Sequence, residues 1–143
     1  MRSGSGATVR VLLIAVGAAL VVAGCGGTGE SDENGVRAAI VGYFDGFADG
    51  DGEAACAHVT GNAKIELVEL AASAGIDSVS CATIVEELSG LIGASEVDRL
   101  RDLTVTNIEI DGARATATIQ GATVRPTLTE SDGAWYIDSG FTG

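Results

Sequence analysis

The chain has 143 residues, enough for one domain with a hydrophobic core of modest size. Its 20 acidic residues outweigh 8 lysines and arginines and give a formal net charge of -12, which repels phosphates and excludes nucleic acid as an expected partner. The same charge excludes electrostatic docking on anionic lipid, so attachment to a membrane needs another source.

Residues 1–24 have the layout of a secretory signal peptide. Arg2 and Arg10 supply positive charge, no acidic residue occurs before Glu30, and the run 11–23 is apolar or small. This run has the length of a secretory h-region and is shorter than the roughly 20 residues that span a bilayer. We therefore expect residues 1–24 to be a cleaved signal peptide.

The end of this segment, Val22-Ala23-Gly24-Cys25, resembles the lipobox of bacterial lipoproteins. The resemblance implies that the Cys25 thiol receives a diacylglyceryl group of palmitate type, and that a peptidase cuts between Gly24 and Cys25. Two acyl chains anchor a protein stably where one is marginal. We expect a lipid-anchored protein on the extracytoplasmic side of the cell membrane. The alternative is an ordinary secretory signal with an incidental cysteine.

Polar and small residues dominate the stretch after Cys25, which predicts a lipidated cysteine and flexible tether over 25–33 and one domain over 34–143. Within that domain, Cys56 and Cys81 are an even pair in an oxidising compartment, which predicts a disulfide. A metal site or a redox role has less support, because the chain has one histidine and no CxxC motif. No metal or cofactor is therefore expected.

Apolar residues at helical spacing predict that the domain begins with helices. In the first of them, Val36, Ile40 and Phe44 lie on one stripe. The expected helices cover 36–49, 53–58, 62–73 and 81–91, with a further helical turn over 96–100.

The apolar period changes to two after residue 102, which predicts strands. They are expected over 103–111, 114–120, 124–130 and 134–138. Asp111-Gly112 and Asp132-Gly133 are hairpin turn signals, and a switch in apolar parity near Asn107 predicts a bulge. Helices followed by antiparallel strands are typical of the α+β class.

Three segments, in this order, resemble the NTF2-like (SnoaL-like) superfamily over roughly 33–140, and more narrowly the small NTF2-like lipoproteins of actinobacteria. They are Val36-Arg37-Ala38-Ala39-Ile40-Val41-Gly42-Tyr43-Phe44 with Ala48-Asp49-Gly50-Asp51, then Ala54-Ala55-Cys56-Ala57-His58-Val59-Thr60 with a later Cys81, and Glu130-Ser131-Asp132-Gly133-Ala134-Trp135-Tyr136-Ile137. The resemblance implies a cone in which about three N-terminal helices pack on a curved antiparallel sheet of about four strands.

The superfamily holds isomerases and dehydratases as well as non-catalytic binding domains. Its enzymes place acids, tyrosines or histidines inside the cone. Neither such a set nor a Ser/His/Asp triad can be assigned here, since His58 is the one histidine. Our leading hypothesis is a non-catalytic binding or interaction domain. The alternative is a SnoaL-like isomerase or dehydratase with an unassigned active site.

A cone of this kind can enclose a pocket for a small hydrophobic ligand. The residues expected to line it are Tyr43, Phe44, Phe47, Ile65, Leu88 and Trp135. The alternative is that these side chains simply fill the core. Function would then reside on the surface, as binding of an envelope protein or as a homodimer formed through the sheet.

Overall fold

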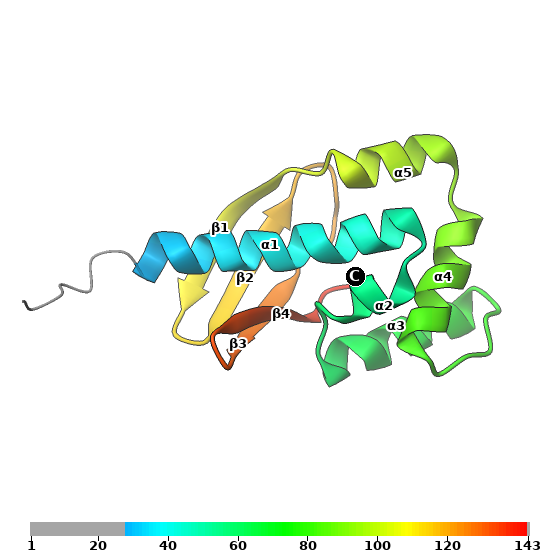
Figure 1. Cartoon of the computed structure of the whole chain (residues 1–143), viewed down its shortest axis with the longest axis horizontal. Coiled ribbons are helices and arrows are strands. Elements are labelled where there is room, and N and C mark those ends of the chain that lie inside the picture. Colours follow the sequence, from blue (N-terminus) through cyan, green and yellow to red (C-terminus); the bar gives the residue numbers. More distant parts are fainter. Residues whose placement is uncertain (1–27, 143) are drawn as a thin grey trace, which may run out of the picture.

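The computed structural model describes residues 28–142 as helices followed by a sheet (Figure 1). The elements are α1 (Thr28–Asp49), α2 (Gly52–Cys56), α3 (Gly61–Ser73), α4 (Cys81–Leu91), α5 (Ala94–Arg101), β1 (Val105–Asp111), β2 (Arg114–Ile119), β3 (Thr127–Ser131) and β4 (Ala134–Ser139). The α+β prediction is confirmed. The resemblance implied about three helices, whereas the described part of the chain has five. The two additional helices are the short segments α2 and α5, which lie where the sequence predicted helical structure over 53–58 and 96–100.

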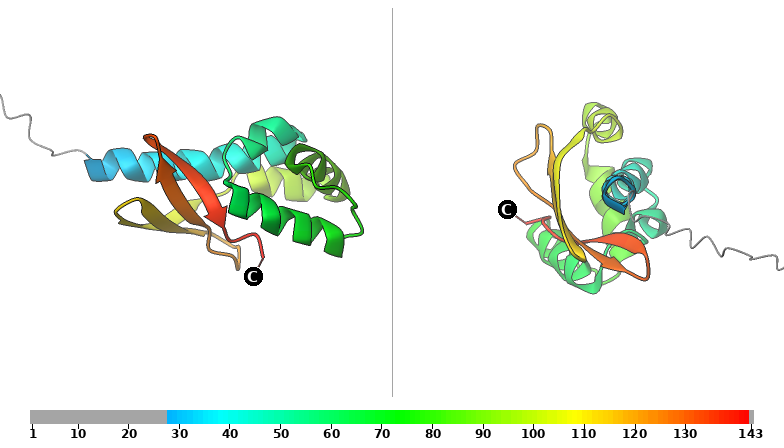
Figure 2. Two further views of the ribbon diagram at one scale, coloured as in Figure 1. Left: turned by 90° about the horizontal axis from the view of Figure 1, so that it is seen from below. Right: turned by 90° about the vertical axis from the view of Figure 1, so that its left-hand side faces the viewer.

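Helix α1 begins at Thr28, well before the start predicted at residue 36. Residues 28–33 therefore belong to a helix, so the prediction of a flexible tether is wrong for these residues. Glu30, Asp32 and Glu33 lie in its first two turns, where the positive end of the helix dipole stabilises acidic side chains. From Val36 onward α1 has a buried stripe, and it runs across one face of the curved sheet (Figure 2).

The strands form one antiparallel sheet in the order β1-β2-β3-β4. The predicted bulge lies in β1 between Thr106 and Glu109, where Asn107 has a φ of 48°. In β2 and β4, alternate side chains are buried in the core. The largest fully buried side chains of the domain are Ile40, Leu67, Ile84, Leu128, Ile137, Val36 and Val85. The core thus lies between the sheet and the helices.

Helix α2 has five residues, too few for stability on its own. Oδ1 of Asp51 accepts a hydrogen bond from the Ala54 backbone nitrogen at 2.9 Å and caps the start of the helix. The predicted disulfide between Cys56 and Cys81 is present, and it joins the end of α2 to the start of α4. Helix α2 is therefore fixed mainly by its neighbours.

Candidate functional site

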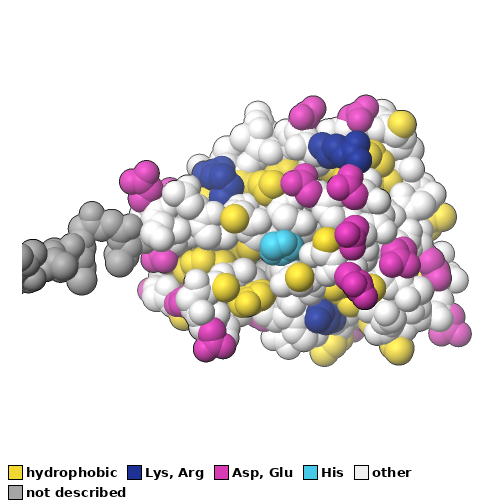
Figure 3. Space-filling model, viewed as in Figure 1, with side chains coloured by type: hydrophobic (Ala, Val, Ile, Leu, Met, Phe, Trp, Pro, Cys, Tyr) yellow, Lys and Arg dark blue, Asp and Glu magenta, His cyan; other side chains and the backbone are white. Residues whose placement is uncertain are grey.

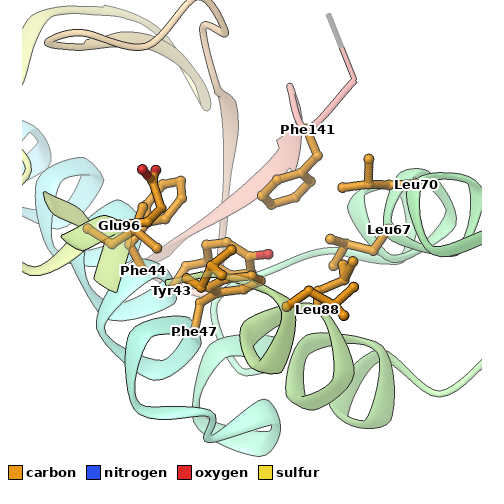
Figure 4. A pocket seen from close by; sticks show the side chains of 11 residues that line it. Tyr43, Phe44, Phe47, Leu67, Leu70, Leu88, Glu96 and Phe141 are labelled. Atoms are coloured by element: carbon orange, nitrogen blue, oxygen red, sulfur yellow. The ribbon is translucent and has the colours of Figure 1, made fainter. Parts of the chain in front are cut away.

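A cavity of about 330 Å³ lies between the second half of α1, helices α3, α4 and α5, and the C-terminal segment (Figure 4). This volume falls in the range of small-molecule pockets. The apolar lining residues are Phe44, Phe47, Leu67, Leu70, Leu88, Leu91, Ile92, Leu100 and Phe141. The other two lining residues are Tyr43 and Glu96, so the wall is almost entirely hydrophobic.

Aromatic side chains of α1 form one wall of the cavity. The ring centroid of Tyr43 lies 5.1 Å from that of Phe44, in an edge-to-face arrangement, and 6.2 Å from that of Phe47. From the C-terminal segment, Phe141 brings its ring centroid to 4.8 Å from that of Tyr43. Aromatic pairs contribute about 0.5–1.5 kcal/mol each beyond their buried area, so these contacts hold the Tyr43 ring in place.

The C-terminal segment is fixed beside the cavity by α3. The backbone nitrogens of Gly140 and Phe141 both donate to Oε2 of Glu66, each at 2.9 Å. Gly140 has a φ of 109°, and a Cβ at this position would lie 2.8 Å from the carbonyl oxygen of Arg125, so only glycine fits this turn well. The two hydrogen bonds to the Glu66 carboxylate therefore position the Phe141 ring against Tyr43.

The Tyr43 side chain is 2% exposed, and its hydroxyl points into the space between Phe141, Leu67 and Leu88 (Figure 4). Burial raises the pKa of Tyr43, so the phenol keeps its proton at neutral pH. Among residues 28–142 we find no hydrogen bond to this hydroxyl and no side-chain polar atom that is both fully enclosed and unpaired. The hydroxyl is therefore within reach of a molecule in the cavity.

Helix α5 lies at the rim of the cavity and has no fully buried residue. A nitrogen of Arg99 donates to Oε1 of Glu96 at 2.7 Å within this helix. A nitrogen of Arg101 donates to Oδ1 of Asp49 at 2.6 Å and connects α5 to the end of α1. Figure 3 shows that acidic side chains gather over this helical end of the molecule. The rim is thus charged, in contrast to the cavity wall.

The structure brings together four of the predicted lining residues, namely Tyr43, Phe44, Phe47 and Leu88. The placement expected for Ile65 is corrected. Ile65 is 60% exposed, because α3 turns Leu67 and Leu70 toward the cavity instead. The spacing of Ala63, Leu67 and Ala71, all buried, follows the helical period and was the available signal for this inner face.

The placement expected for Trp135 is also corrected. Its side chain is 7% exposed, but it packs against the first half of α1, where a Cβ on Gly35 would lie 2.6 Å from Trp135 Cδ1. The lining residues that sequence reasoning missed are Leu67, Leu70, Leu91, Ile92, Glu96, Leu100 and Phe141. Phe141 follows the last strand, and no sequence pattern places it at the cavity.

His58 lies against Gly42 of α1 and does not line the cavity. Residues 28–142 contain no group of three or more histidine, cysteine, aspartate or glutamate side chains that could hold a metal ion. The ionisable groups in the lining are those of Tyr43 and Glu96. The site therefore offers apolar surface, one neutral hydroxyl and a carboxylate at its rim.

Comparison of the chain with models of known protein families, with curated proteins and with solved structures gives no match. No helix in the described range 28–142 is long and apolar enough to cross a membrane. The predicted signal peptide, its cleavage site after Gly24 and the predicted lipidation at Cys25 lie outside the described residues.

Proposed function

We propose that this domain is a non-catalytic binding domain that holds a small hydrophobic molecule in the cavity. The observation that carries the proposal is the lining, because mostly apolar side chains and one neutral phenol surround about 330 Å³. Burial of apolar surface contributes roughly 25 cal/mol per Å², so a ligand that covers this wall gains free energy from it.

A catalytic role is the second candidate, because Tyr43 and Glu96 both reach the same cavity. A general base must be free to accept a proton near the operating pH. The Tyr43 phenol keeps its proton, since burial raises its pKa, and the Glu96 carboxylate is hydrogen-bonded to Arg99. This arrangement favours binding over a SnoaL-like isomerase or dehydratase reaction.

We also propose that the domain is NTF2-like and belongs to a lipoprotein anchored through Cys25 on the extracytoplasmic side. Helices that precede a curved four-stranded sheet, and the lipobox-like stretch that ends at Cys25, support this proposal. Cys25→Ser should release the protein from the membrane or leave the signal peptide uncut. A variant that fractionates and migrates like the wild type would rule out the anchor.

Titration of the full chain with N-phenylnaphthylamine, an uncharged dye that fluoresces in apolar surroundings, tests the binding proposal. We expect saturable binding by the wild type and an affinity lower by about tenfold or more in Leu88→Trp, where the larger side chain occupies part of the cavity. Ile65→Trp adds the same side chain at an exposed site of α3 and should bind like the wild type. Equal affinities of the two variants would contradict the proposal.

A further inference from the structure

The charges of the cavity restrict the kind of ligand that it can hold. None of its lining residues is a lysine, an arginine or a histidine. Its one carboxylate, that of Glu96, is already hydrogen-bonded to Arg99 at 2.7 Å. A ligand carboxylate or phosphate would find no cation among the lining residues, and a ligand ammonium group would have to compete with Arg99 for the Glu96 carboxylate.

The surroundings of the cavity also disfavour negative charge. The hydrogen bond with Asp49 raises the pKa of Arg101 at the end of α5. Asp98 and Asp45 add to this effect through their charges, so several carboxylates lie near this helix. Since the whole chain has a net charge of -12, its long-range field disfavours the approach of an anionic ligand.

The Tyr43 hydroxyl is the one uncharged polar group in the lining. Figure 4 shows it directed away from the α1 backbone into the space bounded by Phe141, Leu67 and Leu88. Because Tyr43 stays protonated, its hydroxyl can donate a hydrogen bond, and we find no hydrogen bond between it and another of residues 28–142. The hydroxyl is not fully enclosed, so an oxygen of a molecule in the cavity can accept a hydrogen bond from it.

We infer that the cavity selects an uncharged, mostly hydrocarbon molecule with one hydrogen-bond-accepting oxygen, as in an alcohol, a ketone or an ester, and that this oxygen accepts a hydrogen bond from Tyr43. The inference rests on the proposed function and adds the chemical class of the ligand. Tyr43 is then the residue that sets specificity, while the surrounding leucines and phenylalanines supply the apolar contact.

Displacement of bound N-phenylnaphthylamine from the full chain by octanol, octanoate, octylamine and octane at neutral pH tests this inference. We expect octanol to bind at least about tenfold more tightly than octanoate or octylamine. Tyr43→Phe should lower the affinity for octanol by about three- to tenfold and leave the affinity for octane unchanged. Tyr136→Phe, which removes the same group from the half-buried tyrosine of β4, is the matched control and should bind all four probes like the wild type.

The outcomes separate this inference from the proposed function. If octanoate or octylamine displaces the dye as well as octanol does, or if Tyr43→Phe keeps the full affinity for octanol, the inference is overturned while binding of the dye still supports a hydrophobic site. If the wild type binds neither the dye nor any of the four probes, the proposed function fails and the inference fails with it.

Discussion

Gly52 of α2 lies so close to Ala82 of α4 that a Cβ at position 52 would be 2.1 Å from the carbonyl oxygen of Ala82. Helix α2 also approaches α1, because a Cβ on Gly46 of α1 would be 2.6 Å from the backbone nitrogen of Ala55. Helix α2 is therefore packed tightly between α1 and α4, the two helices that supply Tyr43 and Leu88 to the cavity.

Gly52→Ala should destabilise the domain by about 1–3 kcal/mol, because the added methyl group meets backbone that cannot rotate away. Urea unfolding measures this change. Gly90→Ala is the matched control, since no heavy atom lies within 4 Å of a Cβ at that position of α4. The control should be unchanged or more stable by up to about 1 kcal/mol. Equal stability of the two variants would show that α2 and α4 are less closely packed than described.

Removal of the disulfide should also loosen α2. The bond between Cys56 and Cys81 closes a loop with a sequence separation of 25. For a loop of this length we expect the double variant Cys56→Ala/Cys81→Ala to lose about 3–4 kcal/mol of unfolding free energy. Urea unfolding of this variant and of the wild type provides the comparison. If thiol alkylation of the unreduced, unfolded wild type modifies both cysteines, the disulfide is absent and the prediction fails at its premise.

Glu66→Ala should weaken ligand binding from outside the cavity. The variant loses the acceptor for the Gly140 and Phe141 nitrogens, so the Phe141 ring is no longer held against Tyr43. We expect the affinity for N-phenylnaphthylamine to fall by about three- to tenfold. Glu66→Gln keeps an acceptor oxygen and should retain most of the affinity. Glu69→Ala, an exposed position of the same helix, should have no effect. An unchanged affinity in Glu66→Ala would mean that Phe141 is not needed to close the site.

The raised pKa of Tyr43 predicts a loss of stability at alkaline pH. Below about pH 10 both the folded and the unfolded chain keep this proton, so the contribution of Tyr43 does not vary. Above that pH the unfolded chain releases the proton while the folded chain, in which burial raises the pKa, retains it. The unfolding free energy should then fall by up to about 1.4 kcal/mol per pH unit.

Urea unfolding of the wild type, Tyr43→Phe and Tyr136→Phe between about pH 9 and about pH 11 isolates this effect. The decrease in unfolding free energy with rising pH should be smaller in Tyr43→Phe than in the wild type. It should remain at the wild-type size in Tyr136→Phe. If the wild type and Tyr43→Phe show the same pH dependence, Tyr43 is not desolvated in the folded protein.

Local signals in the sequence were sufficient for much of the fold. The helix predicted over 81–91 does begin at Cys81, where the hydroxyl oxygen of the preceding Ser80 accepts a hydrogen bond from the Thr83 nitrogen at 3.4 Å. The two Asp-Gly turns and the bulge at Asn107 also lie where the sequence predicted them. Such features depend on neighbouring residues, so one sequence can reveal them.

The cavity depends on contacts between distant residues, and these could not be predicted. Phe141 reaches Tyr43 because Glu66, 75 residues earlier in the chain, accepts its backbone hydrogen bond. Ile65 and Leu67 are both apolar, and the packing of α3 against its neighbours decides which of them faces inward. The start of α1 was missed because residues 28–33 are polar or small and show no apolar period, although acidic side chains there suit a helix N-terminus.

The most direct test of the central claim is native mass spectrometry of the full chain equilibrated with N-phenylnaphthylamine, compared with the mass after denaturation. We predict one dye molecule per chain for the wild type and for Ile65→Trp, and a clearly smaller dye-bound fraction for Leu88→Trp at the same dye concentration, in line with an affinity lower by about tenfold or more. In each case the denatured chain should return to its own mass. A wild-type chain that stays free of dye, or a Leu88→Trp chain that holds as much dye as the wild type, would contradict a hydrophobic binding site at this cavity.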